Sequence, residues 1–424
     1  MTAGGLEIRP LGPDDDLEAE LDLRRRAFGP LTAAILPAWM QGLRASMEAG
    51  QLFGAFAGSR LVASARYYQV RQWWHGRCMP MAGVAGVKVA PEERGRGVGR
   101  ALMTHLLADI AARGFPVSAL YPTTLPLYRS LGWEVAGGRY HTVLAARSLA
   151  ALAAADPALG ADPEPGSQRQ ARGLHRAGPA EAPAVVDVLG LVHRQLRHCG
   201  PGTRDASLVS GWLEDKDRFA YLADDGFLTY RWASDTSELR VDYLLAASPG
   251  TAREFWQILA SHAQMAQTVR ACLPPDDPIT WLAREPEVTT RRSENWMLRI
   301  VDAPAAISSR GYPAAASLSI EVELADPVQP GNSGRWLLEV NGGAGRLTPA
   351  PGSGGTPGRS GMPRPSGPAG GSVLRLGPRG LAALFAGVPM ATLRIAGLAA
   401  GGDPAAASSL DSAFAAQAFM ADYY

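Results

Sequence analysis

The chain has 424 residues, of which 46% are hydrophobic and 19% charged, and its formal net charge is +1. This composition indicates a folded protein of several domains, and it excludes a disordered chain or a coiled coil. The near-zero net charge argues against nucleic acid or an anionic membrane as the main partner, because both require a concentrated basic surface.

In the first 150 residues the order of predicted elements is strand, two helices, three strands, helix, strand, helix and strands. Their predicted bounds are Leu6–Leu11, Leu17–Phe28, Leu31–Glu48, Leu52–Ala57, Leu61–Trp73, Met81–Val89, Gly99–Arg113, Val117–Tyr121, Leu125–Leu131 and a strand pair in Trp133–Ala145. Pro37 is expected to disturb the second helix, and Gly114 to end the third. An α/β domain is therefore predicted for residues 1–150.

Two stretches rich in glycine and proline follow, around 153–178 and at 348–371. Neither contains enough apolar residues to order itself. The first predicts a linker at 151–173 between domains. The second lies between strand-like segments and is expected to be a long loop inside a domain.

Residues 174–295 repeat part of the first element order, which indicates an internal duplication. The predicted elements are a helix at Ala182–Arg197, strands at Phe219–Leu222, Phe227–Trp232 and Leu239–Ala246, a helix at Thr251–Ala263 and a strand at Val269–Leu273. A third domain is expected over 296–424. It opens on the strand-like Trp296–Val301 and ends in a helix predicted over Ala405–Ala421.

The most informative motif is the run V-K-V-A-P-E-E-R-G-R-G-V-G-R from Val87 to Arg100. A strand enters, a turn has glycine at every second position, and a helix leaves. The N–H groups of such a turn, with the positive end of the helix, bind an anion such as a pyrophosphate. The spacing is neither G-x-G-x-x-G nor a P-loop, which argues against a dinucleotide fold and a nucleotide-triphosphate site.

The hexapeptide R-G-R-G-V-G, starting at Arg94, resembles the R-x-x-G-x-G coenzyme-A loop of the GNAT acetyltransferase superfamily. The alternative is a glycine-rich connector without a ligand. The resemblance implies that the strands before and after the loop splay apart to admit the pantetheine arm. It implies cofactor contacts from Val87, Lys88, Val89, Arg94, Gly95, Arg96, Gly97, Val98, Gly99 and Arg100, and further along the chain from Thr123 and Thr124.

The segment P-L-Y-R-S-L-G-W, which contains Tyr128, resembles the Y-x-x-x-G-F/Y segment of the same superfamily. In that family the tyrosine faces the sulfur of the cofactor. The resemblance therefore implies that Tyr128 is the general acid that protonates the departing thiolate. The alternative is an ordinary core tyrosine with its hydroxyl at the surface.

The whole chain, with two GNAT-like segments and an apolar C-terminal end, resembles the enhanced intracellular survival (Eis) family of acetyltransferases. The resemblance implies an α/β (α+β) fold of two tandem GNAT-like domains, at 1–150 and 174–295, followed by a sterol-carrier-protein-like domain at 296–424. It implies that only the first domain binds acetyl-CoA. The equivalent turn of the second segment, around Gly250, has a single glycine and is not expected to bind pyrophosphate.

The Eis resemblance also implies that the terminal carboxylate, here that of Tyr424, accepts the proton of the amine. An end containing Phe414, Phe419 and Met420 is more apolar than most termini, which favours a docked end. A hydrophobic end that merely packs is the alternative. A carboxylate of ordinary pKa ~3.3–3.7 is a weak base, so proton transfer through water is the easier route.

The implied activity is acetyl-CoA-dependent N-acetylation of primary amines, such as aminoglycosides or lysine side chains, by a homohexamer. Phe28, Trp39 and Asp422 are candidates for the acceptor pocket. The alternative from another class is a non-catalytic coenzyme-A-sensing carrier of an apolar ligand. Release of free thiol from acetyl-CoA in the presence of amines distinguishes the two.

Other kinds of site are not predicted. The three cysteines are far apart and odd in number, which fits a reducing cytosol better than a disulfide framework. His193, His198 and Cys199 lack the spacing of zinc ligands, so no metal is expected. The sequence shows neither a signal peptide nor an apolar stretch of membrane-spanning length, and we expect a cytoplasmic protein.

Overall fold

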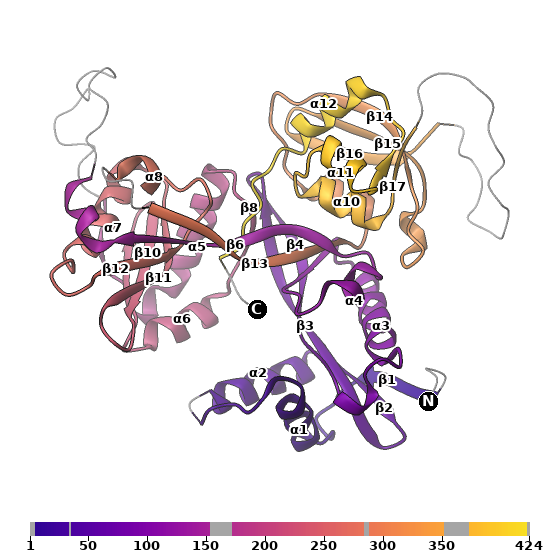
Figure 1. Ribbon diagram of the computed structural model, residues 1–424, viewed down its shortest axis with the longest axis horizontal. Coiled ribbons are helices and arrows are strands. Elements are labelled where there is room, and N and C mark those ends of the chain that lie inside the picture. The colour runs from indigo at the N-terminus through magenta and orange to yellow at the C-terminus, as the bar shows by residue number, and fades with distance from the viewer. Residues whose placement is uncertain (1–4, 34, 153–171, 284–287, 352–372, 422–424) are drawn as a thin grey trace.

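The structure is a computed structural model that describes residues 5–33, 35–152, 172–283, 288–351 and 373–421. The first and second domains lie side by side, and the third packs against the first (Figure 1). The linker expected at 151–173 and the glycine- and proline-rich loop at 348–371 fall mostly outside the described residues.

The first domain follows the predicted element order. Its elements are β1 (Leu6–Pro10), α1 (Leu17–Phe28), α2 (Leu36–Glu48), β2 (Leu52–Ala57), β3 (Arg60–Trp74), β4 (Arg77–Val89), α3 (Val98–Ala112), β5 (Val117–Leu120), α4 (Leu125–Arg129) and β6 (Glu134–Ala145). Two predictions were wrong in detail. Pro37 lies in the first turn of α2, where a missing N–H costs nothing, so the helix begins there. The last segment is one long strand, β6, and not a pair.

The second domain contains β7 (His175–Arg176), α5 (Ala182–Gln195), β8 (Cys199–Gly202), α6 (Ala206–Glu214), β9 (Phe219–Ala223), β10 (Gly226–Trp232), β11 (Glu238–Ala246), α7 (Pro249–Ala260), β12 (Thr268–Cys272), α8 (Ile279–Leu282) and β13 (Val288–Ile300). The third contains α9 (Ala303–Ser309), β14 (Leu318–Leu324), β15 (Gly334–Asn341), β16 (Ala344–Pro349), β17 (Leu374–Leu376), α10 (Pro378–Phe385), α11 (Met390–Ile395), β18 (Ala399–Ala400) and α12 (Pro404–Ala413).

One continuous sheet of the described residues joins the first two domains, in the order β1-β2-β3-β4-β5-β13-β6-β12-β11-β10-β9-β7, with β8 beside β3. Each half contains one parallel pair, β4 with β5 and β11 with β12. Each parallel pair is connected by a helix, α3 or α7, as a parallel crossover requires. The two halves therefore share one topology, which supports an internal duplication.

The two long strands β6 and β13 carry the sheet from one domain to the other. They pair antiparallel from Val288 opposite Leu144 to Leu298 opposite Glu134. The last residues of β13 also pair with β5 of the first domain. The domain boundary expected between 295 and 296 falls inside β13, a strand that the two domains share.

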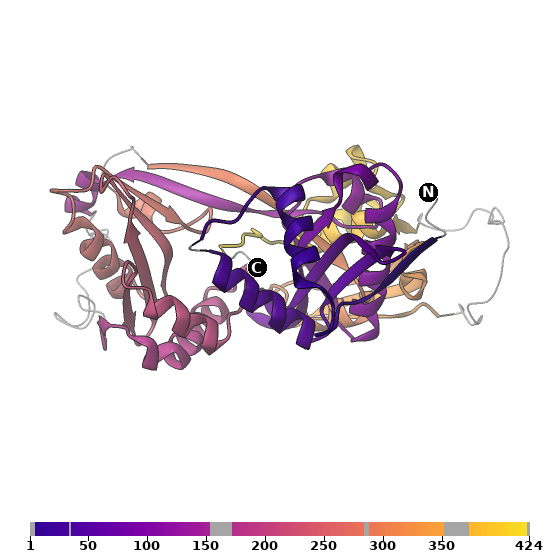
Figure 2. The ribbon, with the colours of Figure 1, turned by 90° about the horizontal axis from the view of Figure 1, so that it is seen from below.

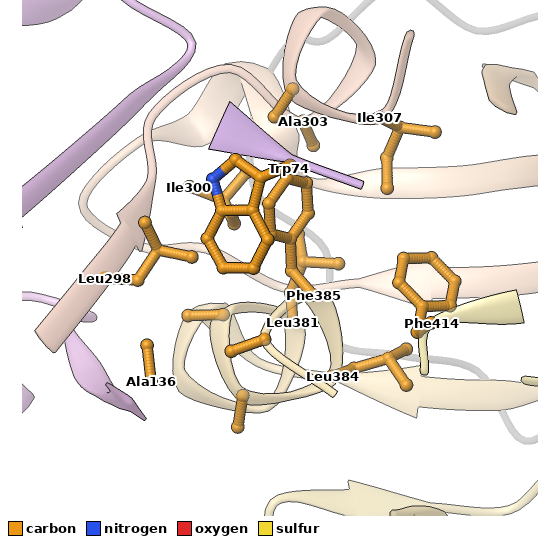
Figure 3. Packing of buried hydrophobic residues seen from close by; sticks show 14 of the residues in the cluster. Trp74, Ala136, Leu298, Ile300, Ala303, Ile307, Leu381, Leu384, Phe385 and Phe414 are labelled. Atoms are coloured by element: carbon orange, nitrogen blue, oxygen red, sulfur yellow. The ribbon is translucent and has the colours of Figure 1, made fainter. Parts of the chain in front are cut away.

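The third domain has its own sheet, β16-β15-β14-β17-β18, and a hydrophobic core that extends into the first domain. Trp74, at the end of β3, lies edge-on to Phe385 of α10 with ring centroids 4.9 Å apart (Figure 3). The ring centroids of Trp74 and Trp296 are 6.2 Å apart. The buried Arg310 donates to the carbonyls of Phe385 and Phe414 in the same core. The contacts of Trp74 with Phe385 and with Arg310 pack the third domain against the sheet.

The C-terminal segment ends differently from its prediction. The helix expected to reach Ala421 ends at Ala413, and residues 418–420 are extended. Phe419 N donates to Cys199 O at 3.0 Å, and Met420 N donates to Gly138 O at 3.0 Å. Hydrogen bonds to two separate strands thus outweigh the helix propensity of this alanine-rich run. Figure 2 shows this tail lying between the first and second domains.

Among the described residues, no helix is both long and apolar enough to span a membrane.

Candidate active site

The glycine-rich turn connects β4 to α3 and leaves its backbone N–H groups accessible. Gly95 and Gly97 have φ of +77° and +81°, the left-handed region that glycine adopts without strain. A Cβ added at either position would meet no atom within 4 Å. At Gly99, by contrast, a Cβ would lie 3.3 Å from Val89 Cγ2, so this glycine lets α3 pack closely on β4.

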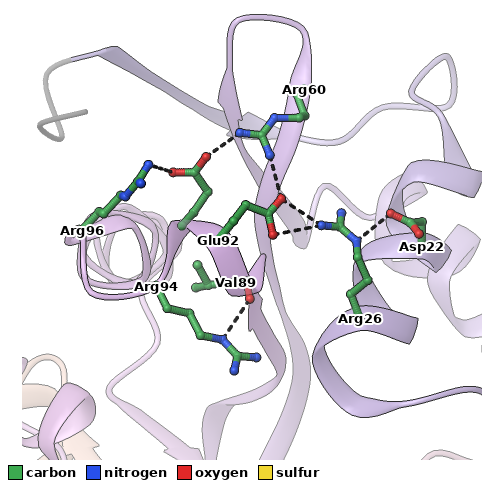
Figure 4. Close-up of polar contacts among 8 residues, drawn as sticks. Asp22, Arg26, Arg60, Val89, Glu92, Arg94 and Arg96 are labelled. Carbon is green, nitrogen blue, oxygen red and sulfur yellow. Dashed lines mark hydrogen bonds and ion pairs between the residues drawn. The ribbon is translucent and has the colours of Figure 1, made fainter.

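A network of ion pairs holds the turn in place (Figure 4). Arg60 bridges Glu92 and Glu93, and Arg26 of α1 also contacts Glu92 at 3.0 Å. The hydrogen bond from Arg60 is the main cause that lowers the pKa of Glu93. Arg96 pairs with Glu93 at 3.1 Å. The carboxylates thus organise the loop from the side of α1 and β3.

The three arginines of the motif are all exposed at the turn. Arg94 Nε donates to the carbonyl of Val89 at 3.4 Å, and Arg100 donates to Ser130 Oγ at 2.6 Å. Accessible amides, a helix N-terminus and three exposed guanidinium groups together fit the pyrophosphate of a coenzyme A molecule.

β4 and β5 separate just before the turn. Their parallel pairing ends at Val84 opposite Leu120, whereas β4 continues to Val89. On its other edge β4 has a bulge where Gly86 adopts φ of +62°. Val87 and Val89 therefore have no strand partner on the β5 side, in the described part of the chain. An extended pantetheine arm can pair with this free edge.

Lys88 points away from that edge into a buried polar cluster. Its Nζ lies 2.6 Å from the carboxylate of Glu20 in α1, and Ser64 Oγ donates to the same carboxylate at 2.8 Å. All three side chains are buried. Burial lowers the pKa of Lys88, while Glu20 opposes that shift. A contact of Lys88 with the cofactor would therefore involve its backbone.

Sequence reasoning missed Glu20 and Ser64. A signal for Glu20 was available, since it lies three residues after Leu17 and next to Leu21 on the apolar side of α1. An acidic residue in that position needs a buried cation. Lys88 is one of only two lysines in the chain, but nothing in the sequence places it opposite Glu20.

Tyr128 lies on α4 in the core of the first domain and is 4% exposed. Its ring lies edge-on to that of Trp133, with centroids 6.4 Å apart. Burial raises its pKa to about 12, so the hydroxyl keeps its proton at neutral pH. No other described residue forms a hydrogen bond with this hydroxyl. The side chain is thus a largely buried phenol whose hydroxyl has no hydrogen bond within the described part of the chain.

The turn and α4 are in contact. Arg100, in the first turn of α3, is bonded to Ser130, two residues after Tyr128. A Cβ on Gly99 would lie 3.7 Å from Leu127 Cδ2. Thr123 and Thr124 are exposed in the connection between β5 and α4. The fold thereby brings the Tyr128 segment and the cofactor-binding motif together.

The remaining predicted residues fall in two groups. Tyr424 and Asp422 lie outside the described residues, although the tail leading to them is docked up to Ala421. Phe28, 46% exposed, ends α1, and Trp39 is half-buried on α2. The structure does not bring these two into contact with Tyr128.

In the second domain, α7 takes the place that α3 has in the first, and side chains of the protein already bond to its N-terminus. Ser248 caps α7 by accepting from Thr251 N, and Thr251 Oγ1 donates to the carboxylate of Asp225. A carboxylate at this position opposes the binding of a second anion. The geometry therefore supports the expectation that this domain binds no pyrophosphate.

Comparisons with known proteins agree with the site. Residues 7–136 and 204–300 each match an acetyltransferase (GNAT) domain, and residues 303–420 match a sterol carrier protein domain. The chain is 30% identical over 311 residues to the N-acetyltransferase Eis of Mycobacterium tuberculosis, covering 70% of this chain and 73% of that protein.

The chain belongs to the Eis family of GNAT N-acetyltransferases. A GCN5-related N-acetyltransferase from Kribbella flavida has the same fold with a TM-score of 0.85 and 39% identity, covering 99% of this chain and 98% of that one. Eis1 from Mycobacterium abscessus, at 22% identity, shares the fold with a TM-score of 0.72 over 99% and 100% of the two chains. Acetyl-CoA is thus the cosubstrate of this Eis-family enzyme, and the reading as a non-catalytic carrier no longer applies.

Proposed function

We propose that this Eis-family enzyme transfers the acetyl group directly from acetyl-CoA to a primary amine in a single step. The attacking nitrogen forms a bond to the carbonyl carbon of the thioester, and the carbon–sulfur bond breaks. Tyr128 gives its proton to the departing sulfur, and the terminal carboxylate of Tyr424 accepts the proton of the amine through water. The enzyme gives one proton to the sulfur and takes one from the amine, so the protons balance.

The observation that carries the proposal is the contact between the coenzyme-A loop and the Tyr128 segment, made through Arg100 and Ser130. A pyrophosphate held at the turn leaves its pantetheine arm beside the free edge of β4. A buried donor that keeps its proton is suited to a developing thiolate.

The residues that we assign to acetyl-CoA follow from the same arrangement. The backbone of Val87, Lys88 and Val89 pairs with the pantetheine arm, and the thioester oxygen is stabilised by a backbone N–H near Val89. The loop residues bind the pyrophosphate, and these are Arg94, Gly95, Arg96, Gly97, Val98, Gly99 and Arg100. Thr123 and Thr124, which follow β5, contact the cofactor from the opposite side of the gap between β4 and β5.

The acceptors that we propose are aminoglycoside-like or lysine-type amines, bound near Phe28, Trp39 and Asp422. We further propose a homohexamer located in the cytoplasm. The tail supports the catalytic role of the C-terminus, because hydrogen bonds to Gly138 and Cys199 fix its course between the two GNAT domains.

The test is release of free thiol from acetyl-CoA by untagged protein with tobramycin, a polyamine and a lysine-containing peptide. The same acceptors with their amines already acetylated are the controls. We expect release with at least one free amine and none with its acetylated form. Absence of release with every amine, despite cofactor binding, would contradict the proposed acceptor class.

A second experiment adds one glycine after Tyr424, with one glycine added before Met1 as its control. We expect the C-terminal addition to lower kcat at least tenfold without weakening the binding of acetyl-CoA. A full rate in the extended enzyme would show that the terminal carboxylate is not the base. The proposed homohexamer is tested separately by light scattering, which should give a molar mass of six chains per particle.

A further inference from the structure

A second positively charged site lies away from the coenzyme-A loop. An open cleft of about 570 Å³ is formed at the end of the β3–β4 hairpin, where α5 of the second domain and α9 of the third domain meet it. Its lining residues are Arg71, Trp73, Gly76, Arg77, Cys78, Met79, Pro80, Arg194, Ser308 and Ser309. All three domains therefore contribute to one cleft.

Among the described residues, the three arginines of the cleft contact neutral groups only. Arg71 donates to the carbonyl of Cys78 at 2.7 Å, and Arg77 donates to the carbonyl of Ser308 at 3.2 Å. The guanidinium of Arg194 lies over the ring of Trp73, 5.8 Å from its centroid. In the described part of the chain no carboxylate pairs with any of them, and no acidic residue lines the cleft.

These contacts use few of the five N–H donors that each guanidinium has. The remaining donors of three arginines face one cleft, together with their uncompensated charge. An anion bound in the cleft would offset these like charges. The three arginines are exposed, and each is oriented by a carbonyl or a ring.

Further polar groups without partners lie at the same cleft. Trp73 is 5% exposed, and its indole Nε1 is a buried donor with no hydrogen-bond partner in the described residues. The hydroxyl of Ser309 likewise has no hydrogen bond there. The hydroxyl of Ser309 is available to a ligand in the cleft, whereas the indole Nε1 has almost no accessible surface, so Trp73 contributes its ring.

We propose that this arginine cleft (Arg71, Arg77 and Arg194 with Trp73 and Ser309) binds an anion bearing two or more phosphate groups. Guanidinium groups bind phosphate oxygens in pairs, and three of them match several oxygens at once. The site is separate from the coenzyme-A loop. Its occupation neutralises the three charges and ties the hairpin, α5 and α9 together, so the ligand stabilises the arrangement of the domains.

The experiment titrates pyrophosphate into the full-length enzyme at constant ionic strength, with coenzyme A at saturation so that the glycine-rich loop is filled. Calorimetry should detect one site per chain, and the apparent melting temperature should rise. The double variant Arg77→Gln, Arg194→Gln should weaken binding at least tenfold. Arg335→Gln, an exposed arginine on β15, is the control and should leave binding unchanged.

Three outcomes of the pyrophosphate titration would overturn the proposal, and a comparison with citrate gives a fourth. They are no heat beyond dilution, binding that the double variant leaves intact, and binding that Arg335→Gln weakens equally. Citrate is the second ligand, and pyrophosphate should bind at least tenfold more tightly. Equal affinity would contradict a phosphate site. Unchanged turnover of acetyl-CoA by the double variant shows that it is folded, since neither arginine belongs to the proposed catalytic machinery.

Discussion

The side chain of Tyr128 is largely buried, its hydroxyl has no hydrogen bond among the described residues, and burial raises its pKa to about 12. Replacing Tyr128 by Phe keeps the ring against Trp133 and removes only the proposed acid. We expect kcat to fall roughly 10²- to 10³-fold, a usual range for a lost general acid, with the affinity for acetyl-CoA nearly unchanged. Tyr312→Phe is the control, because its buried hydroxyl donates to Ile307 O far from the site. Steady-state kinetics measure kcat of both variants. A full kcat for Tyr128→Phe would show that Tyr128 is not the general acid.

The buried pair of Lys88 and Glu20 makes a separate prediction about stability. Lys88→Met leaves the Glu20 carboxylate buried without a cation, and we expect it to destabilise the fold by about 3–5 kcal/mol. Adding Glu20→Gln removes the unpaired charge and should restore most of the loss. Urea denaturation of the single and double variants measures the coupling. Simple additivity of the two substitutions would show that the pair is not coupled.

At the scale of elements, the docked tail depends on a glycine in β8. Gly200 has φ of +104°, and a Cβ there would lie 2.3 Å from Phe419 O. Gly200→Ala therefore pushes the tail away, and we expect kcat to fall at least tenfold while acetyl-CoA still binds. The control is Gly114→Ala, which has the same kind of strain at φ +78° but no atom within 4 Å of its new Cβ. Equal kinetic losses in the two variants would mean that strain, and not the tail, is responsible.

At the scale of the whole molecule, acid should weaken the junction where the tail meets both domains. His193 and His198 share a hydrogen bond between their Nδ1 atoms, and the ring of His198 lies 5.1 Å from that of Phe419. Burial lowers the pKa of each to about 3. Below pH ~6.5 both histidines are protonated in the unfolded chain but remain neutral in the folded one. The free energy of unfolding therefore decreases as the pH falls from about 6.5 towards 3.

Asp277 acts in the opposite direction, because burial raises its pKa to about 7. Asp277 is protonated in the folded state and loses this one proton on unfolding, whereas the two histidines together gain up to two. At pH 4.5–6 these three groups together contribute a slope of about 1.4 kcal/mol per pH unit, with stability rising with pH. His75, whose pKa burial lowers to about 4, adds to the slope in the same direction. Urea denaturation between pH 5 and 7.5 checks this. The double variant His193→Gln, His198→Gln should lower the slope by up to about 2.7 kcal/mol per pH unit, because it removes two groups that take up protons on unfolding. An unchanged slope would contradict the assignment.

The sequence alone determined the features that depend on neighbours along the chain. The glycine-rich turn, the Tyr128 segment and the element order of the first domain were all readable, because φ preferences, helix ends and hydrophobic periodicity act over a few residues. The tertiary structure decided what depends on partners far along the chain. β13 is shared by two domains, the tail is extended at residues 418–420 and not helical, and Lys88 turns to Glu20. Each of these features depends on a hydrogen bond or ion pair with a segment far along the chain. Such bonds outweigh the local helix or strand propensity, and the neighbouring residues do not reveal them.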